Sequence, residues 1–178
     1  MEANSVAGRV RCENLALSSR SGRAALFLPN SENMDLESTG TLAPESWQSR
    51  KGSPQIEVEA IRFDGYEASH PMQVDLVKID VEDFEADVIE GMRSVIRRDR
   101  PFIVCEVLPR KHGNARTLAT IESLRYQPYW ITPAGYIRVA RFDFERGNLT
   151  DFLFSPVSTQ DTVLDNLDIL FELRRAMR

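Results

Sequence analysis

The segment Val74–Pro109 constrains the fold of this chain more than any other stretch. It begins with a short apolar run rich in β-branched residues, Val74–Ile79, which predicts a buried strand. Over Phe84–Arg97 the apolar residues follow the 3.6-residue spacing of a helix, and Pro101 blocks its continuation. Phe102–Val107 is apolar again and predicts a second buried strand. The segment therefore predicts two adjacent parallel strands joined by a right-handed helical crossover.

The predicted helix has one apolar face, so its charged side chains fall on the opposite face. Acidic residues come early and basic residues late, which is the order that the helix dipole favours. These residues are Glu85, Asp87, Glu90, Arg93, Arg97 and Arg98.

Acidic residues also follow both predicted strands. Asp80 and Glu82 come just past the first strand, and Glu106 lies late in the second. In open α/β sheets the carboxyl ends of the strands form the edge where ligands bind, so these carboxylates mark the expected site. Two plainer interpretations stay open. Asp80 and Glu82 can be a helix cap and a solvated first-turn acid, and Glu106 can form a structural pair with Lys78.

Composition limits the classes of function. The chain has 178 residues, enough for one domain with a real core, and its net charge of -5 argues against nucleic acid as a partner. No apolar run is long enough to span a bilayer, and the first residues lack the apolar core of a signal peptide. Cys12 and Cys105 fall inside predicted strands, so we expect two buried reduced thiols and, from them, a cytoplasmic location.

Further elements flank the central unit, and we expect one domain over residues 1–178. The strands before the unit should include a hairpin turning at Ser21-Gly22, followed by a long polar loop that is either mobile or functional. The predicted elements are a strand at Val10–Ser18, its return strand at Ala24–Leu28, a flexible loop around 29–54, a strand at Ile56–Phe63, a helix at Thr117–Arg125, strands at Gln127–Ile131, Tyr136–Ala140 and Asp151–Phe154, and a final helix at Val163–Met177.

The central segment closely resembles the core of the FkbM-type methyltransferases, which use S-adenosylmethionine. The family has an apolar strand ending Lys-Ile-Asp-Val-Glu-Gly-x-Glu, a helix with Leu/Ile-x-Gly, and then Pro before a strand that ends in Glu. The earlier stretch NLALSSRSGRAALF and the later stretch ESLRYQPYWI resemble the family more loosely. The residues that match the central pattern are Lys78, Asp80, Glu82, Glu85, Gly91, Pro101 and Glu106.

The resemblance implies a fold, a cofactor and roles for single residues. It implies an α/β chain with a Rossmann-like class I methyltransferase sheet that transfers a methyl group to a hydroxyl of a small molecule or sugar. Asp80 and Glu82 would be catalytic, and Leu17 and Ser18, together with Asp80, would contact the cofactor. Glu106 and His112 would contact the acceptor, and the plainer interpretation of His112 is a surface loop residue. Asp80, Glu82 and Asp83 have no nearby histidine, so no metal site is predicted.

The chain also departs from the family pattern. Asp83 stands where the family usually has glycine, and no Gly-x-Gly turn precedes the central unit. The chain therefore resembles the carboxyl-terminal two-thirds of such an enzyme, and alone it should bind S-adenosylmethionine poorly and transfer no methyl group. The outer edge of Val74–Ile79 then needs another partner, from this chain or a second one, and a homo-oligomer is compatible with this. The alternative function is a non-catalytic remnant or an interaction domain.

Overall fold

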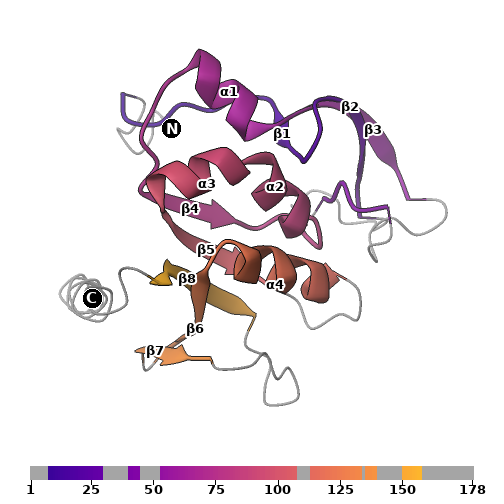
Figure 1. The fold of residues 1–178 in the computed structure, drawn as a ribbon. Coiled ribbons are helices and arrows are strands. Elements are labelled where there is room, and N and C mark those ends of the chain that lie inside the picture. The colour runs from indigo at the N-terminus through magenta and orange to yellow at the C-terminus, as the bar shows by residue number, and fades with distance from the viewer. Residues whose placement is uncertain are drawn as a thin grey trace.

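The computed structural model describes residues 8–29, 40–44, 53–107, 113–133, 135–139 and 150–157. These residues form a mixed α/β structure with two sheets and four helices (Figure 1). None of the described helices is long and apolar enough to cross a membrane. The elements are β1 (Ala16–Leu17), β2 (Gly22–Phe27), β3 (Gln55–Ile61), α1 (Phe63–Ser69), β4 (Leu76–Ile79), α2 (Glu85–Gly91), α3 (Arg93–Asp99), β5 (Phe102–Glu106), α4 (Gly113–Ser123), β6 (Tyr126–Thr132), β7 (Gly135–Arg138) and β8 (Asp151–Pro156).

The larger sheet has the strand order β4-β5-β8-β6-β7. β4 and β5 are parallel neighbours, with Leu76 beside Phe102, which confirms the predicted parallel pairing of these two strands. β8 lies between β5 and β6 and is antiparallel to both. β6 and β7, which correspond to the strands predicted at Gln127–Ile131 and Tyr136–Ala140, pair antiparallel as a hairpin. The sequence predicts β8 as a strand, but its place inside the sheet depends on long-range pairing.

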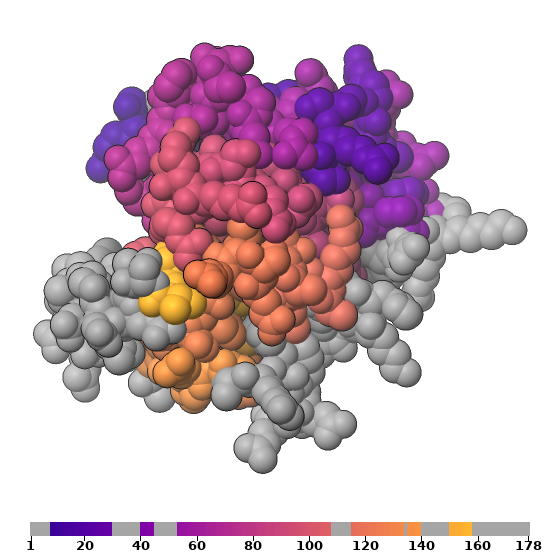
Figure 2. All heavy atoms as spheres, viewed as in Figure 1, coloured from indigo at the N-terminus to yellow at the C-terminus, as the bar shows by residue number. Residues whose placement is uncertain are grey.

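The core lies between this sheet and the helices α2, α3 and α4. Ile79 of β4, Ile103 of β5 and Phe152 of β8 are buried there against Ile89 of α2 and Ile121 of α4. Figure 1 shows α2 and α3 lying between β4 and α1, and in Figure 2 these helices separate the amino-terminal elements from the orange and yellow strands. The packing of these helices on the sheet thus fixes the edge where β4 and β5 end.

The predicted single helix Phe84–Arg97 is two helices, which corrects the sequence-based expectation. Met92 interrupts them, with φ -118° and ψ 20°. Tertiary contacts replace the regular helical bond from Ser94 to Glu90. The guanidinium of Arg62 donates to the Glu90 carbonyl at 3.3 Å, and Asp64 accepts the backbone N–H of Ser94 at 3.1 Å. Both partners come from the start of α1, so the helix pattern alone could not predict the break.

The smaller sheet has the order β1-β3-β2, which contradicts the predicted hairpin between the first two strands. β2 pairs antiparallel with β3, and the two-residue β1 pairs parallel with the other side of β3. β2 and β3 form six residue pairs, from Gly22↔Ala60 to Phe27↔Gln55. β1 has only two residues and could form far fewer pairs with β2. Pairing with β3 therefore prevails over the local turn.

Other expectations have mixed outcomes. Neither Cys105 nor Cys12 forms a disulfide in the part of the chain that the structure describes. Cys105 is buried as predicted, whereas Cys12 is exposed, because β1 begins after it. The helix expected at Thr117–Arg125 is α4, with Ile121 and Leu124 buried. The final helix expected at Val163–Met177 and most of the polar loop lie outside the described residues.

Candidate functional site

The structure brings the three predicted acids to one edge of the larger sheet. Asp80 follows β4 directly, and Glu106 ends its parallel neighbour β5. Burial raises the pKa of Glu106, and the charges of Asp80 and Glu82 raise it further. Lys78 donates to Asp80 at 2.8 Å, so in the described part of the chain this lysine pairs with Asp80 and not with Glu106.

The turn after Asp80 has an uncommon backbone. Glu82 and Asp83 both have positive φ angles, 52° and 72°, which place them in the left-handed region. Non-glycine residues there cost on the order of 1 kcal/mol each and persist only when their surroundings hold them. The hydroxyl of Thr41, a buried residue beside β2, donates to the Glu82 carbonyl at 2.5 Å. Asp83 therefore takes the conformation that glycine favours at this position, and the Thr41 segment supports the turn.

Glu85 supports the same turn from the start of α2. Its Oε1 accepts the backbone N–H of Asp83 at 3.1 Å, and its side chain is buried, with 5% of the residue exposed. Burial raises the pKa of Glu85 to about 7, and the charges of Asp83 and Glu106 contribute. Helical periodicity predicts Glu85 on the charged outer face of the helix, and its burial shows that this prediction is wrong. Its match to the family pattern was the signal that could have identified it.

Leu17 and Ser18, the residues expected beside the cofactor, lie where β1 meets α2. The N–H of Ser18 donates to Ile61 of β3 at 2.9 Å, and a Cβ on Gly91 would overlap the Ser18 carbonyl oxygen. Only glycine at position 91 allows this close approach. This close packing fixes the strand end against α2.

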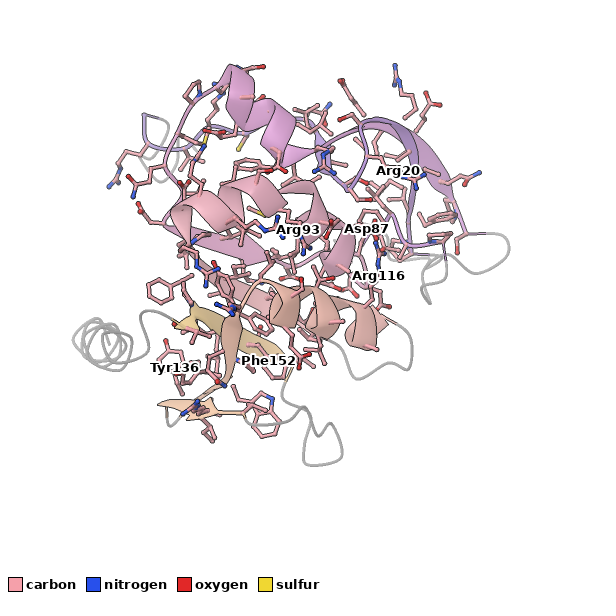
Figure 3. All side chains as sticks on the ribbon, viewed as in Figure 1. Arg20, Asp87, Arg93, Arg116, Tyr136 and Phe152 are labelled. Carbon is pink, nitrogen blue, oxygen red and sulfur yellow. The ribbon has the colours of Figure 1, made fainter. Side chains whose placement is uncertain are left out.

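A partly exposed ion pair secures α2 from two sides. Arg116 of α4 forms an ion pair with Asp87, and Ser19 donates to the same carboxylate at 2.6 Å. Burial raises the pKa of Asp87, but the hydrogen bonds from Arg116 and Ser19 outweigh burial, so the net pKa is lowered. Figure 3 shows Asp87 between Arg116 and the loop that carries Arg20. This network connects β1, α2 and α4 behind the acidic edge.

Of the two histidines, the structure describes only His70. His70 is exposed at the end of α1, where it stacks on Tyr66 with ring centroids 4.5 Å apart. His112 lies outside the described residues. Among the residues that the structure describes, no group of three or more His, Cys, Asp or Glu side chains could hold a metal ion.

Comparison with known proteins gives one match. The model of the methyltransferase FkbM domain matches residues 2–128, a span that includes both β4 and β5 with their acids. No curated protein and no solved structure matches the chain.

Proposed function

The chain belongs to the FkbM methyltransferase family, and from that premise we propose that it carries the acceptor side of a methyl-transfer site. The acceptor is a hydroxyl of a small molecule or sugar, and the methyl donor is S-adenosylmethionine. The acceptor binds at the sheet edge formed by Asp80, Glu82 and Glu106. This position agrees with the general rule that open α/β sheets bind ligands beyond the carboxyl ends of their strands.

The observation that carries the proposal is the position of Glu106 at the carboxyl end of β5, next to the end of β4 that carries Asp80 and Glu82. Burial and the charges of these two acids raise the pKa of Glu106. Methyl transfer to a hydroxyl requires an oxygen in line with the donor methyl group and a base for the hydroxyl proton. A carboxylate accepts a proton more readily when its pKa approaches the working pH. Glu106 is therefore the proposed base, while Asp80 and Glu82 accept hydrogen bonds from the acceptor.

Glu85 has a positioning role in this proposal. Its side chain is buried and contacts the N–H of Asp83, so it maintains the turn that presents Glu82. Two consecutive left-handed residues fix the direction of the chain between the edge of β4 and α2. We expect that a change at Glu85 alters acceptor binding through this turn.

The described residues fit S-adenosylmethionine only in part. Leu17, Ser18 and Asp80 offer a strand end and a carboxylate, but the described ranges contain no glycine-rich turn. The Ser18 carbonyl occupies the space beside Gly91 where a Cβ would lie, so this glycine does not leave room for a ligand there. These residues therefore do not make a complete cofactor site. This supports the second candidate function, an interaction domain without catalysis.

The test uses a chimera in which an FkbM family member supplies the strand–glycine turn–strand segment ahead of residue 8. The chimera is incubated with S-adenosylmethionine labelled in its methyl group and with a panel of sugars and small alcohols. We expect label on an acceptor oxygen. A folded chimera that binds S-adenosylhomocysteine but labels no hydroxyl compound would contradict the proposed function and favour the interaction domain.

A further inference from the structure

The peptide group between Glu82 and Asp83 is held at both of its polar atoms. The hydroxyl of Thr41 donates to the Glu82 carbonyl at 2.5 Å, and Oε1 of Glu85 accepts the N–H of Asp83 at 3.1 Å. This carbonyl and this N–H belong to the same planar peptide bond, so two side chains bind it from its two ends. Rotation of the peptide plane would break both hydrogen bonds.

The orientation of this peptide plane decides the direction of the turn. Rotation about the bonds on its two sides sets ψ of Glu82 and φ of Asp83. These residues have φ angles of 52° and 72°, a conformation that non-glycine residues keep only when their surroundings hold them. The hydroxyl of Thr41 and the carboxyl of Glu85 supply this support, so they fix where the turn carries the side chain of Glu82.

Thr41 is itself held rigidly. It is 1% exposed, and its backbone N–H and C=O bond to Phe27 at the end of β2, at 3.0 and 2.9 Å. Its Oγ1 accepts the N–H of Ala43 at 3.0 Å. A hydroxyl has one proton to donate, and the Glu82 carbonyl lies closer to Oγ1 than the Val81 carbonyl at 3.4 Å. The buried Thr41 hydroxyl is therefore aimed at Glu82.

The hydrogen bond from Thr41 is long-range, whereas the one from Glu85 is local. Thr41 lies beside β2 of the smaller sheet, and Glu85 is on the helix that follows the turn. The central unit has its own packed core, which includes Ile79, Ile89 and Ile103. The Thr41 hydroxyl thus contributes to the direction of the turn more than to the packing of the unit.

We propose that Thr41 is a positioning residue for acceptor binding, which holds the Glu82–Asp83 peptide so that the Glu82 carboxylate meets the acceptor hydroxyl. This inference rests on the proposed function, in which Glu82 accepts a hydrogen bond from the acceptor. The proposed base, Glu106, lies on the neighbouring strand β5. Loss of the Thr41 hydroxyl should therefore weaken acceptor binding more than it slows proton removal.

The test compares Thr41→Val and Thr41→Ser in the chimera, with the acceptor that the chimera labels. Valine has the shape of threonine but no hydroxyl, so KM for the acceptor should rise about tenfold while kcat changes by less than about threefold. Serine keeps the hydroxyl and should restore the KM of the parent. The matched control is Thr117→Val on α4, the same change at a threonine that is also 1% exposed, and it should leave KM unchanged.

Amide exchange on the 178-residue chain supplies a readout that needs no cofactor. Thr41→Val should speed exchange at Asp83, since its peptide is then held at one end, whereas Thr41→Ser and Thr117→Val should match the parent. Slow exchange at Phe102, whose N–H donates to the Asp75 carbonyl at 2.9 Å, confirms that each variant retains the β4–β5 pairing.

The outcomes separate this inference from the proposed function. If Thr41→Val has the KM of the parent while Asp80→Asn and Glu106→Gln lower kcat, the positioning role is overturned and the proposed function stands. Unchanged KM with faster exchange at Asp83 overturns it equally, because the Thr41 hydroxyl then supports the turn without affecting the acceptor. If the folded chimera labels no acceptor, the proposed function fails and the positioning role fails with it.

Discussion

The backbone N–H of Asp83 donates a 3.1 Å hydrogen bond to Oε1 of Glu85, so a buried carboxyl holds a residue in the left-handed conformation. Glu85 thereby connects the acidic turn after β4 to the first residue of α2. The carboxyl of Glu85 contributes both an ionisable group in a buried position and a hydrogen-bond acceptor for the turn. A substitution that removes only the ionisable group separates these two contributions.

Glu85→Gln should remove part of the pH dependence of stability. Burial raises the folded-state pKa of Glu85 from 4.5 to about 7. The native state therefore holds more protons than the unfolded state between these pH values, and stability falls as pH rises through this window. Glutamine cannot ionise but can still accept the hydrogen bond from the N–H of Asp83. Between pH 5 and pH 8 the free energy of unfolding of the variant should therefore fall by on the order of 1–3 kcal/mol less than that of the parent.

Urea unfolding at pH 5 and pH 8 measures this difference. The control is Glu122→Gln, on the exposed surface of α4, which should follow the parent at both pH values. Equal losses in Glu85→Gln and the parent would show that Glu85 ionises normally in the folded chain.

Gly91→Ala should destabilise the fold strongly. A Cβ at residue 91 would overlap the carbonyl oxygen of Ser18, which is backbone and cannot rotate aside. Either α2 or β1 must shift, and we expect a loss of about 2 kcal/mol or more in the free energy of unfolding. Gly65→Ala is the matched control, because a Cβ there meets nothing within 4 Å and alanine favours the helix α1. A Gly91→Ala variant as stable as the parent would refute this close packing.

The isolated chain should bind S-adenosylhomocysteine weakly. Leu17, Ser18 and Asp80 supply only part of the expected contacts, and each missing hydrogen bond costs roughly 0.5–1.5 kcal/mol. The loss of several such bonds should weaken a micromolar site to a dissociation constant above about 100 μM. Calorimetry on the 178-residue chain measures it, with the chimera as the positive control. Tight one-to-one binding would mean that the cofactor is held by contacts not recognised in these residues.

The sequence predicts the central unit well because its signals are local. The apolar run of β4, the helical spacing after Phe84 and the stop at Pro101 each depend on neighbouring residues. The break at Met92 could not be predicted, because it depends on Arg62 and Asp64 of the preceding helix region. The pairing of β2 with β3 likewise depends on residues some thirty positions apart.

For the candidate site, too, the sequence predicts what depends on local signals and misses what depends on tertiary contacts. The position of Asp80, Glu82 and Glu106 at one edge follows from parallel pairing, which the sequence predicts. The burial of Glu85 could not be read from helical periodicity. The charged face of the predicted helix suggested exposure, whereas the left-handed turn before α2 rotates this residue into contact with Asp83.

The central claim is that the acids at the ends of β4 and β5 bind and deprotonate the acceptor hydroxyl. Turnover in the chimera tests this claim most directly. Asp80→Asn and Glu106→Gln should each lower kcat by about 10²–10⁴-fold, as expected for loss of a proton acceptor or its neighbour. Thermal stability should change little for Asp80→Asn, because its pair with Lys78 is exposed. Glu122→Gln should leave kcat unchanged. Turnover in Asp80→Asn and Glu106→Gln comparable to that of the parent chimera would contradict the acceptor site proposed for this edge.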